Sequence, residues 1–398
     1  MARTFLVVIS GYDQPGITRE VLRSLPSDNN VIDVQQILSE GMLTLHVVVQ
    51  SDESIESMQG LLFKNLESFE VSVSINEAKH HDVSITSNQL VVTLMAQHLT
   101  VEHLSLVSEA ILAMGSNIDS IERIAQYPVT ALEMRVSQGN VDALRVKLSQ
   151  IASENHLDLA VQRGTLQRRG RHLVVLDVDS TLIQEGVIDL LGKHLGVEKQ
   201  ISDITDEAMR GEIDFTTALR QRVKLLAGTP VENLEGLRNT ITLSPGAKTL
   251  FRVLRYLDYK IALVSGGFDF IVEQLAIELG ADGFVANHLA IEDGVLTGTI
   301  QGAVIDREGK AKALRDFAES FSISIERTIA IGDGANDIDM ISAAGLGIAF
   351  NAKSIVQDVA DTSLNVPYLD SVLYLLGITR MEIEQLNREL GARSFPEV

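Results

Sequence analysis

The apolar positions near the start of the chain follow a strand period first and a helix period next. An apolar run, FLVVIS, ends at a turn that contains Pro15 and Gly16, and apolar residues then recur at helical spacing. The expected order is a strand at 5–10, a helix at 17–25, two strands within 31–50, a helix at 55–66 and a strand at 69–75. This order predicts a βαββαβ unit.

The same pattern begins again near Asn88. QLVVTLMAQ predicts a strand, LTVEHLSLVSEAILAMG a helix, and VDALRVKLSQIASENH a second helix before the strand LDLAVQ. The chain therefore contains an internal repeat with a period of roughly 85 residues. The basic segment QRRGRH, residues 167–172, follows the second repeat and marks a predicted boundary.

From Leu173 onward, strand patterns alternate with helix patterns. This alternation is typical of an α/β fold, an open and mostly parallel Rossmann-like sheet with helices on both faces. After the first strand comes a helical stretch that is too long to be a loop, so we expect an inserted helical cap. The predicted division is residues 1–84, 85–168 and 169–398, with the cap at about 184–245.

Charge and composition narrow the possible partners. A chain of 398 residues is expected to form more than one domain. The formal net charge of -21 argues against nucleic acid or an anionic membrane as a partner. No apolar run reaches the roughly 18 residues of a membrane span, and the N-terminal apolar run is short for a signal peptide, so we expect a cytoplasmic protein. The absence of cysteine excludes a thiol nucleophile.

Polar residues follow three of the predicted strands in the α/β part. Asp177 and Asp179 follow the first strand, Ser265 and Gly266 the second, and Asp333 the third. Ligands bind beyond the carboxyl ends of the strands in such sheets. We therefore expect these residues to converge on one crevice.

The residue types in this crevice favour phosphoryl chemistry. Neighbouring carboxylates repel one another unless a cation or a proton lies between them, and their oxygens suit Mg²⁺. Ser265 and the backbone amide of Gly266 can donate to phosphate oxygens, and Lys310, at the start of a predicted helix, supplies a positive charge. In the absence of cysteine, a carboxylate nucleophile would give an aspartyl-phosphate.

The segments DVDST, VSGGF and GDGAND, with Lys310 before the last, resemble the motif set of the haloacid dehalogenase superfamily, in the order of its phosphoserine phosphatase branch. The resemblance covers about residues 173–376. It implies that Asp177 is the nucleophile and a metal ligand, and that Asp179 is the general acid and base and offers its backbone carbonyl to the metal. It also implies that Asp333 completes the metal site with Asn336 and Asp337 in support. The phosphate-binding residues that it implies are Ser265, Gly266 and Lys310, and Asn336 is a further substrate-binding residue.

The predicted cap carries part of the same resemblance. EAMRGEIDFTTALRQRV is similar to the cap segment of the branch and puts Arg222 where the family holds the substrate carboxylate. Family members usually carry a glutamate nine residues after the nucleophile to read the substrate amine. Gly186 stands at that position here, so we expect the neighbouring Glu185 to serve.

The two N-terminal repeats resemble ACT domains, which are small modules that bind amino acids. DQPGI, from Asp13 to Ile17, matches the loop before the first helix, and the second repeat lacks the Pro-Gly pair. The resemblance implies an effector site that includes Asp13 and Gly16, with L-serine or another amino acid as the effector, and a homodimer.

The resulting hypothesis is an Mg²⁺-dependent phosphatase that converts O-phosphoserine to L-serine and phosphate, with no nucleic acid or membrane partner. Two alternatives remain. The first is a phosphatase for another small phosphate ester, because Gly186 departs from the family pattern. The second is an amino-acid sensor with weak phosphatase activity, which the complete set of motif residues argues against.

Overall fold

The computed structural model describes residues 3–78, 89–165, 168, 170 and 172–391. The chain forms two compact units, residues 1–85 and 86–398. The second unit contains the second repeat together with the whole α/β part. The predicted boundary at 168/169 thus separates two parts of one compact unit.

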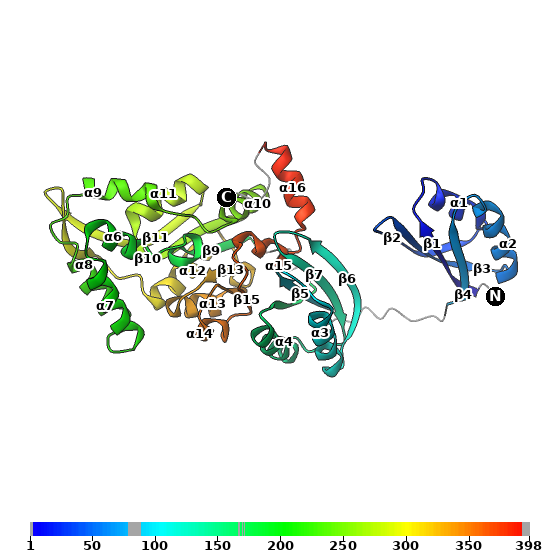
Figure 1. The fold of residues 1–398 in the computed structure, drawn as a ribbon, viewed down its shortest axis with the longest axis horizontal. Coiled ribbons are helices and arrows are strands. Elements are labelled where there is room, and N and C mark those ends of the chain that lie inside the picture. Colours follow the sequence, from blue (N-terminus) through cyan, green and yellow to red (C-terminus); the bar gives the residue numbers. More distant parts are fainter. Residues whose placement is uncertain (1–2, 79–88, 166–167, 169, 171, 392–398) are drawn as a thin grey trace. The chain divides into compact units, whose positions relative to one another are not determined.

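The first unit has the predicted βαββαβ order (Figure 1). Its four strands form an antiparallel sheet in the order β2-β3-β1-β4. Alternate residues of β1 and β3 are buried against the two helices, which gives this unit its own apolar core. The elements are β1 (Arg3–Tyr12), α1 (Ile17–Ser24), β2 (Asn30–Ser39), β3 (Met42–Ser51), α2 (Ile55–Leu66) and β4 (Val71–Glu77).

The second repeat has the same order of elements, as the internal repeat predicted. Its helices pack against its sheet through a separate apolar cluster that includes Leu94, Ile111 and Leu148. The elements are β5 (Leu90–Ala96), α3 (Val101–Ala113), β6 (Asn117–Ala125), β7 (Thr130–Ser137), α4 (Val141–Asn155) and β8 (Asp158–Arg163).

The α/β part is built on a mostly parallel sheet, as predicted. The strands are β9 (Leu173–Asp177), β10 (Lys260–Phe268), β11 (Gly283–Glu292), β12 (Val295–Gln301), β13 (Thr328–Gly332), β14 (Leu346–Phe350) and β15 (Thr362–Leu364). β9 lies between β10 and β13, so its carboxyl end is at the middle of the sheet edge. β12 pairs with β11 as an antiparallel hairpin.

Helices cover both faces of this sheet, and the alternation of side chains in β9 shows why. Val174 and Leu176 belong to one apolar cluster, and Leu173 and Val175 to another on the opposite face. The helices that contribute to the first cluster include α10 (Ala247–Tyr256) and α11 (Asp269–Leu279), and those that contribute to the second include α12 (Arg307–Ser320) and α13 (Ile338–Ala343).

A helical insert follows β9, as the sequence predicted. Its helices are α6 (Val187–Leu195), α7 (Glu198–Met209), α8 (Phe215–Lys224) and α9 (Glu232–Glu235). The two ends of the insert pair with each other through an antiparallel bridge between Ile183 and Leu243. The amide of Gln184 donates to the carbonyl of Thr242 at 2.9 Å, and that of Ser244 to the carbonyl of Leu182 at 2.9 Å. The chain therefore leaves the core for the cap and returns to the core at the same place.

The second repeat and the α/β part share one sheet, with the order β12-β11-β10-β9-β13-β14-β15-β8-β5-β7-β6. The connection is narrow, because β15 meets β8 at a single antiparallel pair, Thr362 and Ala160. Buried polar contacts support it: Asp158 accepts from the backbone amides of Asn365 and Val366 at 2.8 and 3.0 Å.

A buried ion pair also lies at this connection. Arg168 Nη2 lies 2.7 Å from Glu133 Oε2, and Arg168 Nε donates to the carbonyl of Leu375 at 3.1 Å. Leu375 belongs to α15 (Val372–Leu375), and α14 (Ser354–Gln357) and α16 (Arg380–Glu389) are the other C-terminal helices. In the part of the chain that the structure describes, no helix has the length and apolarity to cross a membrane.

Candidate active site

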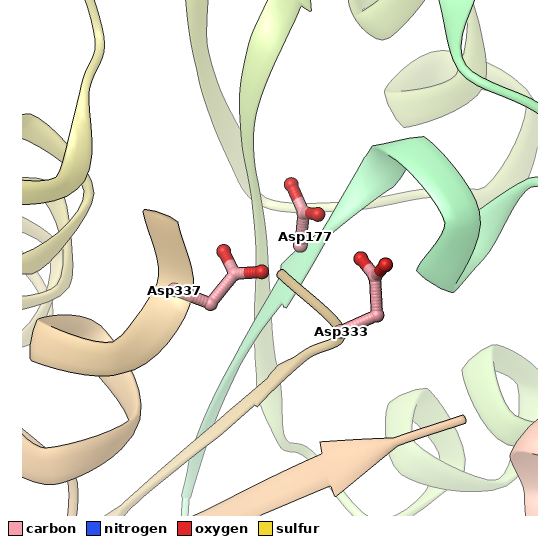
Figure 2. Close-up of side chains that lie close together, drawn as sticks. All are labelled: Asp177, Asp333 and Asp337. Carbon is pink, nitrogen blue, oxygen red and sulfur yellow. The ribbon is translucent and has the colours of Figure 1, made fainter. Parts of the chain in front are cut away.

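Three aspartates meet at the carboxyl edge of the parallel sheet (Figure 2). Asp177 is the last residue of β9, Asp333 follows β13, and Asp337 ends the short turn before α13. One carboxylate oxygen of each lies within 4.8 Å of those of the other two. Three hard oxygen ligands so close together fit a divalent cation such as Mg²⁺.

Lys310 is the positive charge within this cluster. Its side chain comes from the first turn of α12 and is completely buried. The Nζ atom donates to Asp177 Oδ1 at 2.5 Å and to Asp337 Oδ1 at 2.7 Å. Burial alone would lower the pKa of Lys310, but the two carboxylates outweigh burial and raise it. Lys310 therefore stays charged.

The aspartates outnumber this single cation, and their pKa values reflect the excess of negative charge. Burial, followed by the charge of Asp337, raises the pKa of Asp177 well above its usual range. The same two causes raise the pKa of Asp333 to about 6. The site therefore favours a further positive charge, which a metal ion or protons can supply.

Asp179 lies in the turn that follows β9, and its carboxylate has hydrogen-bond partners of its own. Its Oδ1 accepts from the backbone amide of Val187 at 2.6 Å, and its Oδ2 accepts from the hydroxyl of Ser265 at 2.8 Å. The turn between Asp177 and the cap is tight, with Ser180 at φ 59°, in the left-handed region. This turn places two carboxylates on the same edge although their side chains have different partners.

The last residues of β10, from Ser265 to Phe268, form an irregular loop at the end of the strand that lies against Asp179 and the cap. The hydroxyl of Ser265 accepts from the amide of Gly267 at 2.7 Å. A Cβ at Gly267 would lie 2.9 Å from Asp179 Oδ2, and one at Gly266 would lie 2.9 Å from Phe215 of α8. Glycine is therefore needed at both positions for this close approach. A Cβ at Gly266 would also lie 3.8 Å from Asn336 Nδ2, which brings Asn336 to the same loop.

Arg222 reaches toward this site from α8 of the cap. Its guanidinium contacts Thr205 Oγ1 at 3.4 Å and the carbonyl of Ala218 at 3.4 Å. Burial lowers the pKa of Arg222, while the charges of Asp189 and Asp179 oppose this effect. The guanidinium is thus within electrostatic reach of the carboxylates of Asp189 and Asp179.

Glu185 has a different surrounding. It is exposed, and its Oε2 lies 3.0 Å from Lys193 Nζ. The binding of the substrate amino group by Glu185 therefore stays a prediction. Asp189 lies near Arg222 and Asp179, and sequence reasoning missed it because nothing in the pattern VIDLL distinguishes it from a solvated helix residue.

Asp13 and Gly16 belong to the first unit. Gly16 directly precedes α1 with φ 106°, which a residue with a side chain rarely adopts. The amide of Asp13 donates to the carbonyl of Gly41 at 2.9 Å, and its side chain is exposed. The predicted loop thus exists, and its binding role stays a prediction.

Comparison with known protein families agrees with this geometry. The model of haloacid dehalogenase-like hydrolases matches residues 174–342. Two ACT domain models match residues 3–75 and 87–162. The crystal structure of a HAD family hydrolase from Salmonella enterica serovar Typhi aligns with a TM-score of 0.64 at 26% identity, covering 72% of this chain and 98% of that one. The chain is therefore a haloacid dehalogenase-like hydrolase that carries two ACT domains.

Similar sequences narrow the family further. Phosphoserine phosphatase SerB2 of Mycobacterium tuberculosis is 43% identical over 385 residues, which cover 95% of this chain and 94% of that protein. Phosphoserine phosphatase of Streptomyces coelicolor is 43% identical over 386 residues, or 96% and 94% of the two chains. This chain belongs to the phosphoserine phosphatase family.

Proposed function

We propose that the chain hydrolyses O-phospho-L-serine to L-serine and phosphate, the last step of serine biosynthesis, through an aspartyl-phosphate intermediate. The observation that carries the proposal is the buried arrangement of Asp177, Lys310, Asp333 and Asp337 at the sheet edge, in a chain similar over almost its full length to two phosphoserine phosphatases.

Asp177 and Asp179 divide the chemistry between them. An oxygen of Asp177 attacks phosphorus, the ester P–O bond breaks, and Asp179 gives its proton to the departing serine oxygen. Asp179 then takes a proton from the water that attacks the phosphoenzyme, which releases phosphate and restores Asp177. The bonds from Ser265 and Val187 to Asp179 support this role because they orient its carboxylate.

Mg²⁺ is the proposed metal, held by Asp177, Asp333 and the backbone carbonyl of Asp179, with Asp337 beside them. When bound, it would neutralise charge on the transferred phosphoryl group and the aspartates. The three clustered carboxylates support a divalent cation, and the choice of Mg²⁺ rests on their hard oxygen donors.

The proposed substrate contacts surround this centre. Ser265, the amide of Gly266, Lys310 and Asn336 bind the phosphoryl group, and Arg222 binds the serine carboxylate. The electrostatic interaction of Arg222 with Asp179 supports its assignment, because the carboxylate of phosphoserine lies close to the phosphate. The sequence assigns the amine to Glu185, but this side chain is exposed and paired with Lys193, so Glu185 is not included among the proposed substrate contacts.

The ACT domains suggest control by an amino acid. The proposed effector is L-serine, with Asp13 and Gly16 in its site, because backbone amides at a helix start can donate to a carboxylate. A homodimer and a cytoplasmic location complete the proposal.

Release of phosphate from O-phospho-L-serine, with and without Mg²⁺, tests the proposed function. We expect turnover that chelation abolishes and Mg²⁺ restores. Faster turnover of other small phosphate esters than of phosphoserine would favour a different phosphatase. A serine-binding protein with negligible turnover of any ester would favour the sensor alternative.

A further inference from the structure

The amino group of phosphoserine is a cation that needs a carboxylate partner at the cap side of the site, if the chain has the proposed function. Most acidic side chains around the crevice are already engaged. Asp177 and Asp337 bind Lys310, and Asp179 accepts from Ser265 and Val187. The residue that binds the amino group must therefore be a carboxylate near Arg222 and Asp179 whose oxygens have no other partner.

Asp189 meets this requirement. It lies in the first turn of α6, the first helix of the cap, and it is exposed. Among the described residues, its carboxylate has neither a hydrogen bond nor an ion pair within 4 Å, whereas Glu185 is paired with Lys193. A cation that enters the crevice would meet Asp189 without first breaking an existing contact.

Gly186 explains how the Asp189 side chain reaches the crevice. A Cβ built on Gly186 would lie 2.9 Å from Asp189 Oδ2 and 3.7 Å from Asp179 Oδ1. The Asp189 carboxylate therefore extends into the space that a side chain at position 186 would enter, next to the proposed acid and base. A bulkier residue at this position would displace it.

The charges around Asp189 suit a zwitterion. The charges of Arg222 and Asp179 both act on Asp189, so the cap side of the site holds a cationic group and a carboxylate that interact electrostatically. The amino and carboxylate groups of serine are bonded to the same carbon. A site that binds both groups therefore needs an anionic and a cationic side chain close to each other.

We propose that Asp189 binds the ammonium group of phosphoserine while Arg222 binds its carboxylate, and that Glu185 does not contact the substrate. Asp189 thereby determines specificity for an amino-acid phosphate. The amine is then recognised even though Gly186 stands where the family usually has a glutamate, and Glu185 precedes it. The inference rests on the proposed phosphoserine phosphatase activity.

If Asp189 had only a structural role, its substitution would affect substrates with and without an amino group equally. An acidic residue in the first turn of a helix stabilises the helix through its dipole, whatever the substrate. Asp189 could also act through Arg222, and its loss would then weaken any substrate that carries a carboxylate. Both roles predict equal effects on substrates that differ only in the amino group.

The experiment compares Asp189→Asn with the matched variant Glu185→Gln, which makes the same chemical change four residues earlier in the chain. Each variant and the parent are assayed with O-phospho-L-serine and with 3-phosphonooxypropanoate, which keeps the carboxylate and lacks the amine. The ratio of kcat/KM for the two substrates is independent of the fraction of folded enzyme.

We expect Asp189→Asn to lower kcat/KM for phosphoserine by about 10–100-fold, mostly through KM, because a charge-assisted bond is lost. The amine-free substrate should change by less than about threefold, and Glu185→Gln should leave the ratio near that of the parent. Equal losses on both substrates, or a selective loss in Glu185→Gln alone, would overturn the inference. A parent enzyme that does not hydrolyse phosphoserine would instead refute the proposed function itself.

Discussion

Lys310 shows at the scale of one residue how the active centre is held together. A buried ammonium is costly unless it is paired, and Lys310 has no exposed surface. Asp177 and Asp337 provide the pairing, but together with Asp333 they bring three negative charges to one positive charge. The repulsion among these carboxylates is therefore only partly balanced by Lys310, which is typical of a site that binds a cation.

The substitution Asp177→Asn should separate activity from stability. We expect turnover of phosphoserine to fall by more than about a thousandfold, since an amide is a poor nucleophile and a poor metal ligand. The thermal midpoint without added metal should not decrease, because the raised pKa of Asp177 means that the fold tolerates a neutral side chain better than a carboxylate. Phosphate release and thermal unfolding measure the two effects.

Asp316→Asn is the matched control, because Asp316 is an exposed aspartate of α12 paired with Lys312. It should behave like the parent in both measurements. Activity of Asp177→Asn within tenfold of the parent would show that Asp177 is not the nucleophile.

At the scale of elements, the sequence predicted most of what local patterns can encode. The two βαββαβ repeats, the α/β alternation and the convergence of Asp177, Lys310 and Asp333 all follow from periodicity and motif order, and the structure confirms this arrangement. Strand and helix periods are set by neighbouring residues, so they can be read from a single chain.

Two features could not be predicted, for a physical reason. The junction between β15 and β8 depends on Thr362 and Ala160, which lie far apart in sequence and carry no local signal of pairing. The interaction of Asp189 with Arg222 depends on how α6 and α8 come together in the cap, which no short segment encodes. Both features arise from tertiary packing and not from local propensity.

The cap helix α8 provides a test of substrate recognition. Arg222→Ala should lower kcat/KM for phosphoserine by about 10–100-fold more than for p-nitrophenyl phosphate, since only phosphoserine has a carboxylate to lose. Arg220→Ala is the control, because Arg220 is exposed on the same helix. Equal losses with both substrates would mean that Arg222 supports the cap and does not contact phosphoserine.

The junction of β8 with the C-terminal segment should respond to pH through Asp158. Burial raises the pKa of Asp158 to about 6, although the amides of Asn365 and Val366 oppose this effect. A raised carboxyl pKa means that the folded state binds a proton more tightly than the unfolded state. The contribution of Asp158 to stability should therefore increase as the pH falls from about 6 toward 3.8.

Asp158→Asn, which cannot titrate, isolates this contribution. The free energy of unfolding of the parent should rise relative to that of the variant by about 1 kcal/mol between pH 7 and pH 5. Urea unfolding at the two pH values measures the difference. A parent that loses stability relative to the variant over this range would show that Asp158 does not have a raised pKa.

At the scale of the whole molecule, the chain combines a catalytic centre with two domains that contain none of its residues. The first ACT domain forms a unit of its own, whereas the second shares a sheet with the phosphatase part. A ligand on the second ACT domain would therefore act on structure that is continuous with the catalytic core. A ligand on the first must act through a change in its interactions with the rest of the protein or with another subunit.

The loop before α1 tests whether the first ACT domain senses serine. Gly16 has φ 106°, and a valine there would force the loop into another conformation because β-branched residues do not adopt this region without strain. We expect Gly16→Val to weaken inhibition by serine, measured as the ratio of turnover with and without serine. Allosteric coupling of typically ~1–3 kcal/mol limits inhibition in the parent to roughly 5–150-fold.

Gly115→Val is the matched control, because Gly115 also has a positive φ of 71° and no atom within 4 Å of an added Cβ, but it lies in the second ACT domain, after α3. It imposes a similar backbone strain and should leave the inhibition ratio unchanged. Competition at the active site does not depend on the loop before α1. If serine inhibits Gly16→Val as strongly as the parent, and increasing phosphoserine removes the inhibition completely in both, serine acts as a product at Asp177 and the first ACT domain is not its sensor.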